Sequence, residues 1–419
     1  MKPNRIIVPL IFLIFAVISF LTNILGPLVP DIINSFNLSI GLAGFLPFSF
    51  FVAYGVMSIP SGILIEKYSE KSVLIAAFVL AFVAALVFAV FTTFTTALLS
   101  LFSIGIGMAM LQVVINPLLR HTGGEEHFAF NSVMANFFFG AASFLSPLLY
   151  SAMVTNIHSG DNSSAIVAFF NRLVTPELKW VSLYWVFAVT CVLMIIVIAF
   201  IRFPKVELKA DEKIDTGSSF KELLQNNNVL LYFVGILAYV GTEQGIANWM
   251  SKFLQLYHGV DPATGGATAI SYFWGLITVG CFLGLGLLKL FDSRRILIVF
   301  ASGCLISLIS ALFGSQAVAT IAFPVTGLFL SIMWSIVFSL GMNSVPHHHG
   351  TFSGILCTGI VGGALVPLII GGIAELVGLR LAMTFMFITL GYILSIGFWA
   401  KPLVNNSIIK SWSELFKGA

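Results

Sequence analysis

Twelve long apolar runs constrain the fold of this chain more than any other feature of its sequence. Each is close to the roughly 20 helical residues that cross the hydrocarbon core of a bilayer. In lipid, a helix satisfies its own backbone hydrogen bonds, whereas an isolated strand does not. A membrane barrel would show segments of about 10 residues with alternating polarity instead. The sequence therefore predicts an all-α membrane protein of twelve transmembrane helices. The runs fall at 8–31, 43–65, 73–93, 96–119, 128–154, 181–201, 229–256, 267–290, 296–314, 317–343, 350–375 and 382–400.

The composition places the chain in lipid rather than in water. Of its 419 residues, 58% are hydrophobic and 9% are charged, whereas a soluble domain carries about 25% charged residues. The net charge of +3 is small and spread along the chain, so nucleic-acid binding has no support. The lipid bilayer is thus the expected partner of most of the surface.

Nothing in the sequence predicts a cofactor, a metal centre or an enzyme. The run His347-His348-His349 has no partner cluster, which disfavours a metal interpretation. The chain lacks the GxxxxGK[ST] pattern of an ATP-driven pump. The cysteines lie inside apolar runs without a CxxC pair, which favours small core side chains over disulfides or metal ligands. They are Cys191, Cys281, Cys304 and Cys357.

The basic residues orient the helices. With both termini in the cytoplasm, 16 of the 20 Lys and Arg residues fall in inner connections and tails and 4 on the outer side. Because positive charge accumulates in cytoplasmic loops, this bias predicts an inside N-terminus. We expect a multi-pass protein of the plasma membrane, in bacteria the inner membrane.

A charged segment at 202–228 divides the chain into two halves. We expect an N-terminal six-helix bundle at 1–201, a cytoplasmic linker at 202–228, and a C-terminal six-helix bundle with a short cytoplasmic tail at 229–419. Matching features recur at nearly one offset: Pro147 and Pro367 are 220 positions apart, as are Asn23 and Glu243, and Gly62 and Gly286 are 224 apart. In such duplicated membrane proteins the substrate site lies near the midplane between the halves.

Glu243 is the carboxylate that sequence reasoning places at membrane mid-depth, whereas Asp31 and Glu375 fall at predicted helix ends. A charge at the bilayer centre costs about 2.5–3.5 kcal/mol on insertion scales. We interpret Glu243 as a proton-titrating or substrate-binding group, with a structural acceptor between helices as the alternative. Gln244, Asn248 and Lys252 follow at helical spacing and predict a polar stripe that faces a cavity or the bundle interior.

Neutral amides gather in the other predicted helices. An amide offers both donors and acceptors, so the group predicts a polar cavity for an uncharged polyhydroxylated ligand. For any one amide, an interhelical hydrogen bond of about 0.6 kcal/mol is the alternative role. The group consists of Asn23, Gln112, Asn116, Asn131 and Asn136. Trp249, Trp274 and Trp334 also lie within predicted spans. Trp334 and Trp249 either line the site or fill the core. For Trp274 we expect core packing.

Five segments in both halves resemble the fucose–galactose–hexose symporters, a branch of the major facilitator superfamily. They are FSFFVAYGVMSIPSGILIEKYSEKS at 48–72, LQVVINPLL at 111–119, HFAFN at 127–131, YVGTEQG at 239–245 and VFSLGM at 337–342. The stretch with Gly62, Glu66, Lys67 and Lys71 resembles a degenerate form of the superfamily's cytoplasmic loop motif, which implies a role in gating. The resemblance implies the major facilitator-type fold and a sugar transporter that alternates inward and outward access, coupled to protons or sodium.

The sequence departs from that branch where coupling resides. An Asp in helix 1 and a Glu in helix 4 are central in the fucose-type members, and the matching positions here are Asn23 and Gln112. Two polar positions of helix 5 are Met134 and Phe137 here. Some hexose-type members carry Gln in helix 4 and Glu in helix 7, as this chain does. The fucose-type mechanism therefore does not carry over to this chain, and if transport is proton-coupled, we expect Glu243 to be the coupling group.

The leading hypothesis is a secondary active transporter of a neutral sugar or sugar derivative, monomeric, and coupled to a proton or to sodium. The alternative is a proton-coupled exporter of amphipathic small molecules, which the apolar fifth helix favours. A third class, a sensor on a transporter scaffold, usually carries an appended soluble domain, and the sequence shows none.

Overall fold

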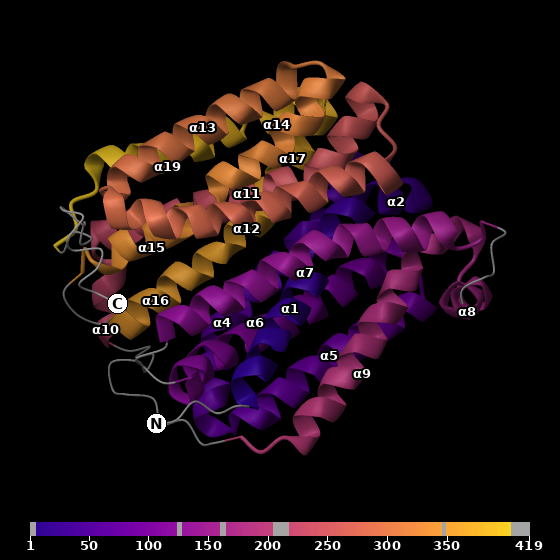
Figure 1. The fold of residues 1–419 in the computed structure, drawn as a ribbon, viewed down its shortest axis with the longest axis horizontal. Helices are drawn as coiled ribbons and strands as arrows, with labels where there is room; N and C mark the ends of the chain where they lie inside the picture. Colours follow the sequence, from indigo (N-terminus) through magenta and orange to yellow (C-terminus); the bar gives the residue numbers. More distant parts are fainter. Residues whose placement is uncertain (1–5, 124–127, 160–164, 204–217, 346–348, 404–419) are drawn as a thin grey trace.

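The computed structural model describes residues 6–123, 128–159, 165–203, 218–345 and 349–403. These residues form helices without strands, which confirms the predicted all-α fold. Twelve helical stretches in them are long and apolar enough to cross a membrane, with six on either side of the 202–228 segment. Figure 1 shows these helices running side by side in two groups.

The N-terminal half builds its six spans from eight helices and a short turn of 3-10 helix. The pairs α1 with α2 and α3 with α4 each make one span, and the 3-10 turn Pro176–Val181 leads into α9. A ninth helix, α8, lies between the fifth and sixth spans. The α-helices are α1 Ile7–Asn23, α2 Leu25–Phe36, α3 Ile40–Ala43, α4 Phe45–Lys67, α5 Glu70–Val90, α6 Phe94–Gly123, α7 Phe128–Asn156, α8 Ala165–Leu173 and α9 Ser182–Phe200.

The C-terminal half follows the same plan after a short helix, α10. Breaks divide its fourth span into α14 and α15, its fifth into α16 and α17, and its sixth into α18 and α19. A short π-helix, Pro262–Gly266, opens the span of α12, and a 3-10 turn, Gly359–Val361, joins α16 to α17. The α-helices are α10 Ser218–Leu224, α11 Asn227–His258, α12 Ala267–Leu290, α13 Ser293–Phe313, α14 Gln316–Leu330, α15 Met333–Met342, α16 His349–Thr358, α17 Gly362–Val377, α18 Leu379–Met383 and α19 Met386–Trp399.

The first span breaks between α1 and α2, at Ile24. Pro27 lies three residues further on and has no N–H to donate to the Asn23 carbonyl, so one bond of the helix ladder is lost. The sequence predicts one continuous run from 8 to 31, whereas the structure extends the span to Phe36. Asp31 consequently lies inside α2 rather than at a helix end, and its Oδ2 accepts a hydrogen bond of 2.7 Å from the Tyr150 hydroxyl.

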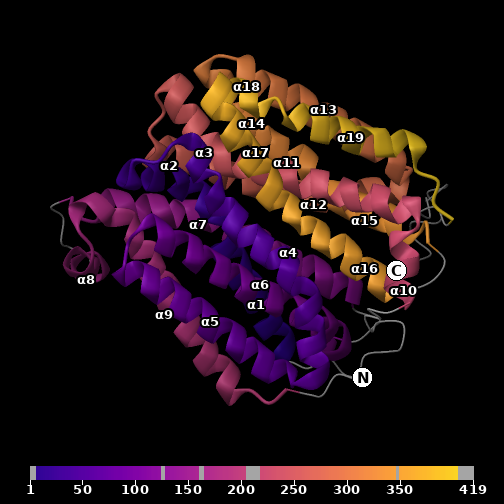
Figure 2. The same ribbon diagram turned by 180° about the vertical axis from the view of Figure 1, so that it is seen from behind.

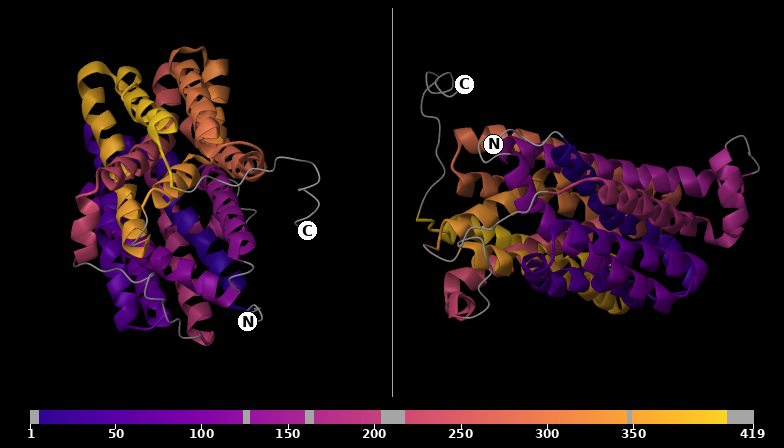
Figure 3. Two further views of the ribbon diagram at one scale, coloured as in Figure 1. Left: turned by 90° about the vertical axis from the view of Figure 1, so that its left-hand side faces the viewer. Right: turned by 90° about the horizontal axis from the view of Figure 1, so that it is seen from below.

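The two halves meet mainly where α7 packs on α12, α3 and α4 pack on α17, and α2 packs on α11. The end-on view in Figure 3 shows the two groups as adjoining bundles, indigo to magenta below and orange to yellow above. Seen from behind, α4 of the first bundle lies beside α16 and α17 of the second (Figure 2). Any site between the halves is therefore built from these helices and from α6 and α15, which flank them.

Glycines bring the halves together most closely in the outer part of the bundle, in the orientation that the charge bias predicts. A Cβ placed on Gly26 would meet the carbonyl oxygen of Ala247 in α11, and one on Gly371 would lie 3.0 Å from the carbonyl oxygen of Ile40. Two hydrogen bonds cross the same region: Ser271 Oγ donates to the Phe144 carbonyl at 2.6 Å, and the Gly41 N–H donates to Glu375 Oε1 at 3.1 Å. The outer side is closed in this conformation.

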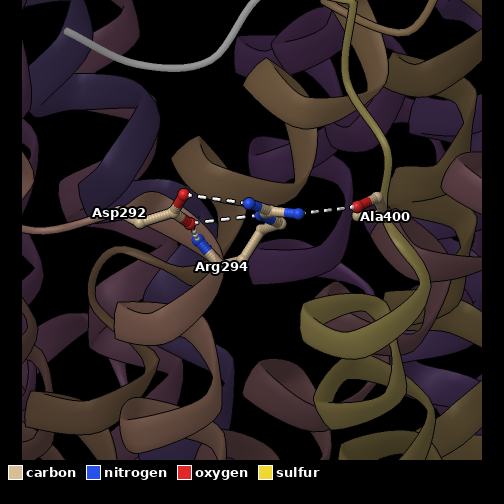
Figure 4. Close-up of polar contacts among 3 residues, drawn as sticks. All are labelled: Asp292, Arg294 and Ala400. Carbon is tan, nitrogen blue, oxygen red and sulfur yellow. Dashed lines mark hydrogen bonds and ion pairs between the residues drawn. The ribbon is translucent and has the colours of Figure 1, made fainter.

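A cation at the start of the third span of each half caps the carbonyl end of the sixth. Lys71 Nζ donates to the carbonyls of Ala199 and Ile201, at 2.6 and 2.9 Å. In the second half, Arg294 Nη1 donates to the Ala400 carbonyl at 3.4 Å (Figure 4). The last carbonyls of a helix have no partner within it and carry partial negative charge, so a cation stabilises them. Each bundle is thus tied together in the same way, at the end where its sixth span finishes.

Asp292 holds Arg294 in place for this contact. Its carboxylate accepts bonds from Arg294 Nη2 at 3.1 Å and from the Arg294 backbone N–H at 2.8 Å (Figure 4). These bonds to Arg294 lower the pKa of Asp292 below its ordinary value. The stabilisation is present above that ordinary pKa and is lost as the pH falls through the lowered one.

We predict that Gly26→Val separates the outer halves. The added side chain overlaps the Ala247 carbonyl, and such overpacking costs about 1–3 kcal/mol, which shifts a two-state equilibrium roughly 5- to 150-fold. A Cys at Ser271, which is buried at the outer interface, should then react faster with a membrane-impermeant maleimide added outside. Gly286→Val is the matched control, because a Cβ there meets no atom within 4 Å. Equal labelling rates in the two variants would contradict the prediction.

Candidate functional site

Glu243 lies on α11 with one tyrosine and one tryptophan beside it. The Tyr239 hydroxyl, one turn earlier on the same helix, donates to Glu243 Oε1 at 2.7 Å. The Tyr239 ring contacts the Trp334 ring of α15 at 6.0 Å between centroids. Glu243 and Trp334 are half-buried, whereas Tyr239 is buried. The structure thus links Glu243 and Trp334, which the sequence analysis singles out, through Tyr239, which the sequence analysis does not single out.

A pocket opens next to this cluster, between the two halves. It encloses about 100 Å³, whereas pockets for whole ligands are commonly about 300–1,000 Å³. The pocket is therefore smaller in this conformation than one that encloses a whole ligand. Two residues of its wall, Ile332 and Ser335, lie within two positions of Trp334 along the chain. It is lined by Asn136 and Phe137 of α7, by Thr278, Cys281, Phe282, Leu285 and Leu288 of α12, and by Ile332 and Ser335 at α15.

Asn23 and Gln112 bond mainly within the N-terminal half. Asn23 is buried, and its Nδ2 donates to Ser143 Oγ of α7 at 2.8 Å. The Ser19 hydroxyl joins the same network, which links α1 to α7. Gln112 of α6 accepts a hydrogen bond at Oε1 from the Tyr54 hydroxyl of α4. In this conformation both amides hold spans of one bundle together.

The remaining amides of α6 and α7 separate. Asn136 is exposed and lines the pocket. Asn131 is buried at the cytoplasmic start of α7, where its Nδ2 donates to the Gly123 carbonyl at 3.3 Å, so it joins α7 to α6 away from the pocket. Asn116 lies in α6, and its side chain is outside the described part of the chain.

The polar stripe of α11 is buried at the closed outer interface. Asn248 Nδ2 donates to the Gln244 carbonyl at 2.8 Å and to its Oε1 at 3.3 Å. Lys252, also buried, donates to Gln255 Oε1 at 2.8 Å. Trp249 is fully buried with its Nε1 bonded to the Pro367 carbonyl at 3.1 Å, so it packs in the core. The stripe, predicted to face a cavity or the bundle interior, is thus buried in the interior in this conformation.

Of the four loop-motif residues, the structure describes two side chains. Gly62 lies in α4, and Lys71 makes the bonds to the end of α9. The side chains of Glu66 and Lys67 are outside the described residues, as are His347 and His348. No group of three or more His, Cys, Asp or Glu that fits a metal ion occurs among the described residues.

The chain belongs to the major facilitator superfamily, whose family model matches residues 11–360. It is 28% identical to a glucose/galactose transporter of Brucella abortus over 91% of this chain and 90% of that one. It is 24% identical to the L-fucose-proton symporter of Escherichia coli, over 88% of this chain and 86% of that one. The crystal structure of the latter organism's fucose:proton symporter, an N162A variant, matches with a TM-score of 0.67 at 19% identity, over 96% of this chain and 100% of that one.

We predict that Asn23→Ala destabilises the protein more than Asn136→Ala. The first change removes the bond to Ser143, and such bonds are worth about 0.6–1.7 kcal/mol in membrane proteins. The second truncates an exposed pocket amide, for which changes stay within about 0.5 kcal/mol. Unfolding of the purified variants in detergent measures both. A larger loss of stability in Asn136→Ala would show that this assignment of roles is wrong.

Proposed function

We propose that this protein is a secondary active transporter that carries a neutral sugar or sugar derivative across the bacterial inner membrane by alternating access. The observation that supports it most is the pocket between the halves, which adjoins a titratable carboxylate and two aromatic rings. An indole face packs on the apolar face of a sugar ring, while the Asn136 amide and the Ser335 hydroxyl offer both donors and acceptors. The sugar transporters among the relatives point to the same substrate class.

The proposed movement is a rocking of residues 1–201 against residues 229–419, with both termini in the cytoplasm and a single chain as the working unit. Closely packed glycines and few hydrogen bonds join the outer halves, so they separate without breaking a large network. In the closed-outside conformation the ligand leaves or enters through the cytoplasmic side. Gln244 and Asn248 are buried between the halves and become available to a ligand when the outer side opens. Gly62, Glu66, Lys67 and Lys71 belong to the gating loop of this movement.

Glu243 is the proposed coupling group, with a proton as the coupling ion and sodium as the other candidate. A charge in the hydrocarbon region is costly, so a carboxylate there gains a proton when it faces the low-dielectric interior and loses it when it faces water. The Tyr239 hydroxyl donates to the ionised form and so lets the carboxylate exist without a cation beside it. Proton coupling is also what the name of the fucose relative describes for that protein.

The alternative function is a proton-coupled exporter of amphipathic compounds. Its support is the apolar share of the pocket wall, to which Phe137, Phe282 and Leu285 belong. Export requires the same pocket and the same carboxylate, and it differs in the ligand that binds.

We predict that a neutral monosaccharide raises the melting temperature of the purified protein. A ligand that binds the native state alone stabilises it by mass action, by about 2.7 kcal/mol at one hundred times its Kd. D-glucose, D-galactose and L-fucose are the first probes, with mannitol as a control for unspecific solute effects. Stabilisation by hydrophobic cations and by none of the sugars would favour the exporter.

We predict that Glu243→Gln abolishes sugar accumulation driven by a pH gradient and leaves sugar exchange partly intact. The amide keeps the size of the side chain and an acceptor for Tyr239, but it cannot release a proton. Uptake and counterflow in proteoliposomes measure the two activities. Asp31→Asn is the matched control, since Asp31 also lies in a span and also accepts a bond from a tyrosine. An unchanged pH dependence in Glu243→Gln would exclude Glu243 from coupling.

A further inference from the structure

Trp274 of α12 presents a buried donor that the protein itself does not use. The side chain is 3% exposed, and its Nε1 has no hydrogen-bond partner among the described residues. A buried indole N–H usually finds a partner, because a donor without one keeps its desolvation cost. Trp249, another buried tryptophan, follows that rule with a bond of 3.1 Å from its Nε1 to the Pro367 carbonyl. The unpaired N–H of Trp274 therefore calls for a partner that the protein does not supply.

The depth of Trp274 in the bundle can be found from the point where α2, α11 and α12 meet. A Cβ on Gly26 of α2 would meet the Ala247 carbonyl of α11 and lie 3.4 Å from Ile270 Cδ1 of α12. One helical turn, about 5.4 Å, separates this point from the next layer on its cytoplasmic side. Residues three or four positions apart share a helix face, so that layer contains Glu243, four residues before Ala247 in α11, and Trp274, four residues after Ile270 in α12. Trp274 thus stands in the same layer as the coupling carboxylate.

The same face of α12 continues into the pocket. Thr278, Cys281 and Leu285 follow Trp274 at spacings of four, three and four residues, which is the spacing of one helix face, and all three line the pocket. Trp274 lies one turn closer to the outer side than these residues, at the end of the pocket where the two halves pack together. A ligand that fills the pocket and reaches the Glu243 layer therefore ends against the Trp274 indole.

We propose that the Nε1–H of Trp274 donates a hydrogen bond to a neutral oxygen of the transported solute, a hydroxyl or ring oxygen of a sugar. An indole N–H only donates, so it selects for an acceptor. A carboxylate or phosphate there would stand in the same layer as Glu243, and two like charges at this depth repel strongly. This inference rests on the proposed sugar transport. It adds Trp274 as the residue that binds one oxygen of the substrate.

The test removes the N–H from the protein and, separately, the oxygen from the ligand. Trp274→Phe keeps an aromatic ring and lacks the donor. Trp185→Phe is the matched control, because Trp185 also has a buried Nε1 without a partner among the described residues but lies in α9, outside the interface of the halves. Binding of whichever of glucose, galactose or fucose stabilises the wild type is measured alongside each of its monodeoxy analogues.

We expect Trp274→Phe to weaken sugar binding roughly 2- to 12-fold, the value of one neutral hydrogen bond, and Trp185→Phe to leave it unchanged. One monodeoxy analogue should bind the wild type more weakly than the parent sugar by the same factor. Trp274→Phe should bind that analogue and the parent sugar equally. Trp274→Met, which also lacks the donor and adapts to irregular space, serves if Trp274→Phe does not fold.

Each other outcome decides against the proposal. If the wild type binds a sugar and Trp274→Phe discriminates among the analogues as the wild type does, the donor role is wrong and the transport proposal stands. If Trp185→Phe weakens binding as much as Trp274→Phe, the effect is not specific to the indole at the site. If no neutral sugar binds the wild type, the transport proposal and this inference fall together.

Discussion

The close approach of the two halves at Gly26 is the contact on which the rest of this structure depends. Between helices in lipid there is little hydrophobic driving force, so association relies on small residues that let backbones touch. The absence of a side chain at Gly26 lets α2 reach the backbone of α11 and the side chain of α12 at one point. That point closes the outer side and fixes the layer beneath it. A bulkier residue would move the polar layer and also the wall of the pocket that α12 supplies, because α12 takes part in both.

The polar layer is asymmetric, although the two halves repeat one plan. On the N-terminal side, Asn23 is engaged with Ser143, and Gln112 with Tyr54, within their own bundle. On the C-terminal side, the carboxylate of Glu243 bonds to Tyr239 of its own helix and adjoins the pocket. The half with neutral amides thus supplies a stable wall, and the half with the carboxylate supplies the group for which we propose a change of charge. Asn23 and Glu243 occupy equivalent positions in the two halves, and this division assigns a different physical role to each.

Sequence reasoning predicted the parts of the structure that lipid dictates. Long apolar runs gave the twelve spans, because backbone satisfaction in a bilayer leaves helices as the solution. It was less informative about which polar side chains meet. The spacing of Gln244, Asn248 and Lys252 indicates one face, but only contacts with other helices decide whether that face is covered. Tyr239 was within reach of the sequence, one turn before Glu243. Thr278 and Cys281 were not, since their helix face carries no polar periodicity.

Two kinds of contact separate what moves from what stays fixed. Within each bundle, a cation spans from the third helix to the end of the sixth: Lys71 contacts two carbonyls, and Arg294, held by Asp292, contacts the Ala400 carbonyl. Between the bundles, the outer contacts are glycine packing and single hydrogen bonds such as that from Ser271 to Phe144. Bonds of the first kind resist bending of a bundle, whereas those of the second kind are few and are replaceable by water at an opening surface. Rocking of two stiff bundles therefore breaks fewer of these contacts than bending within a bundle does, and in the proposed transport cycle it exposes the Trp274 and Glu243 layer to one side at a time.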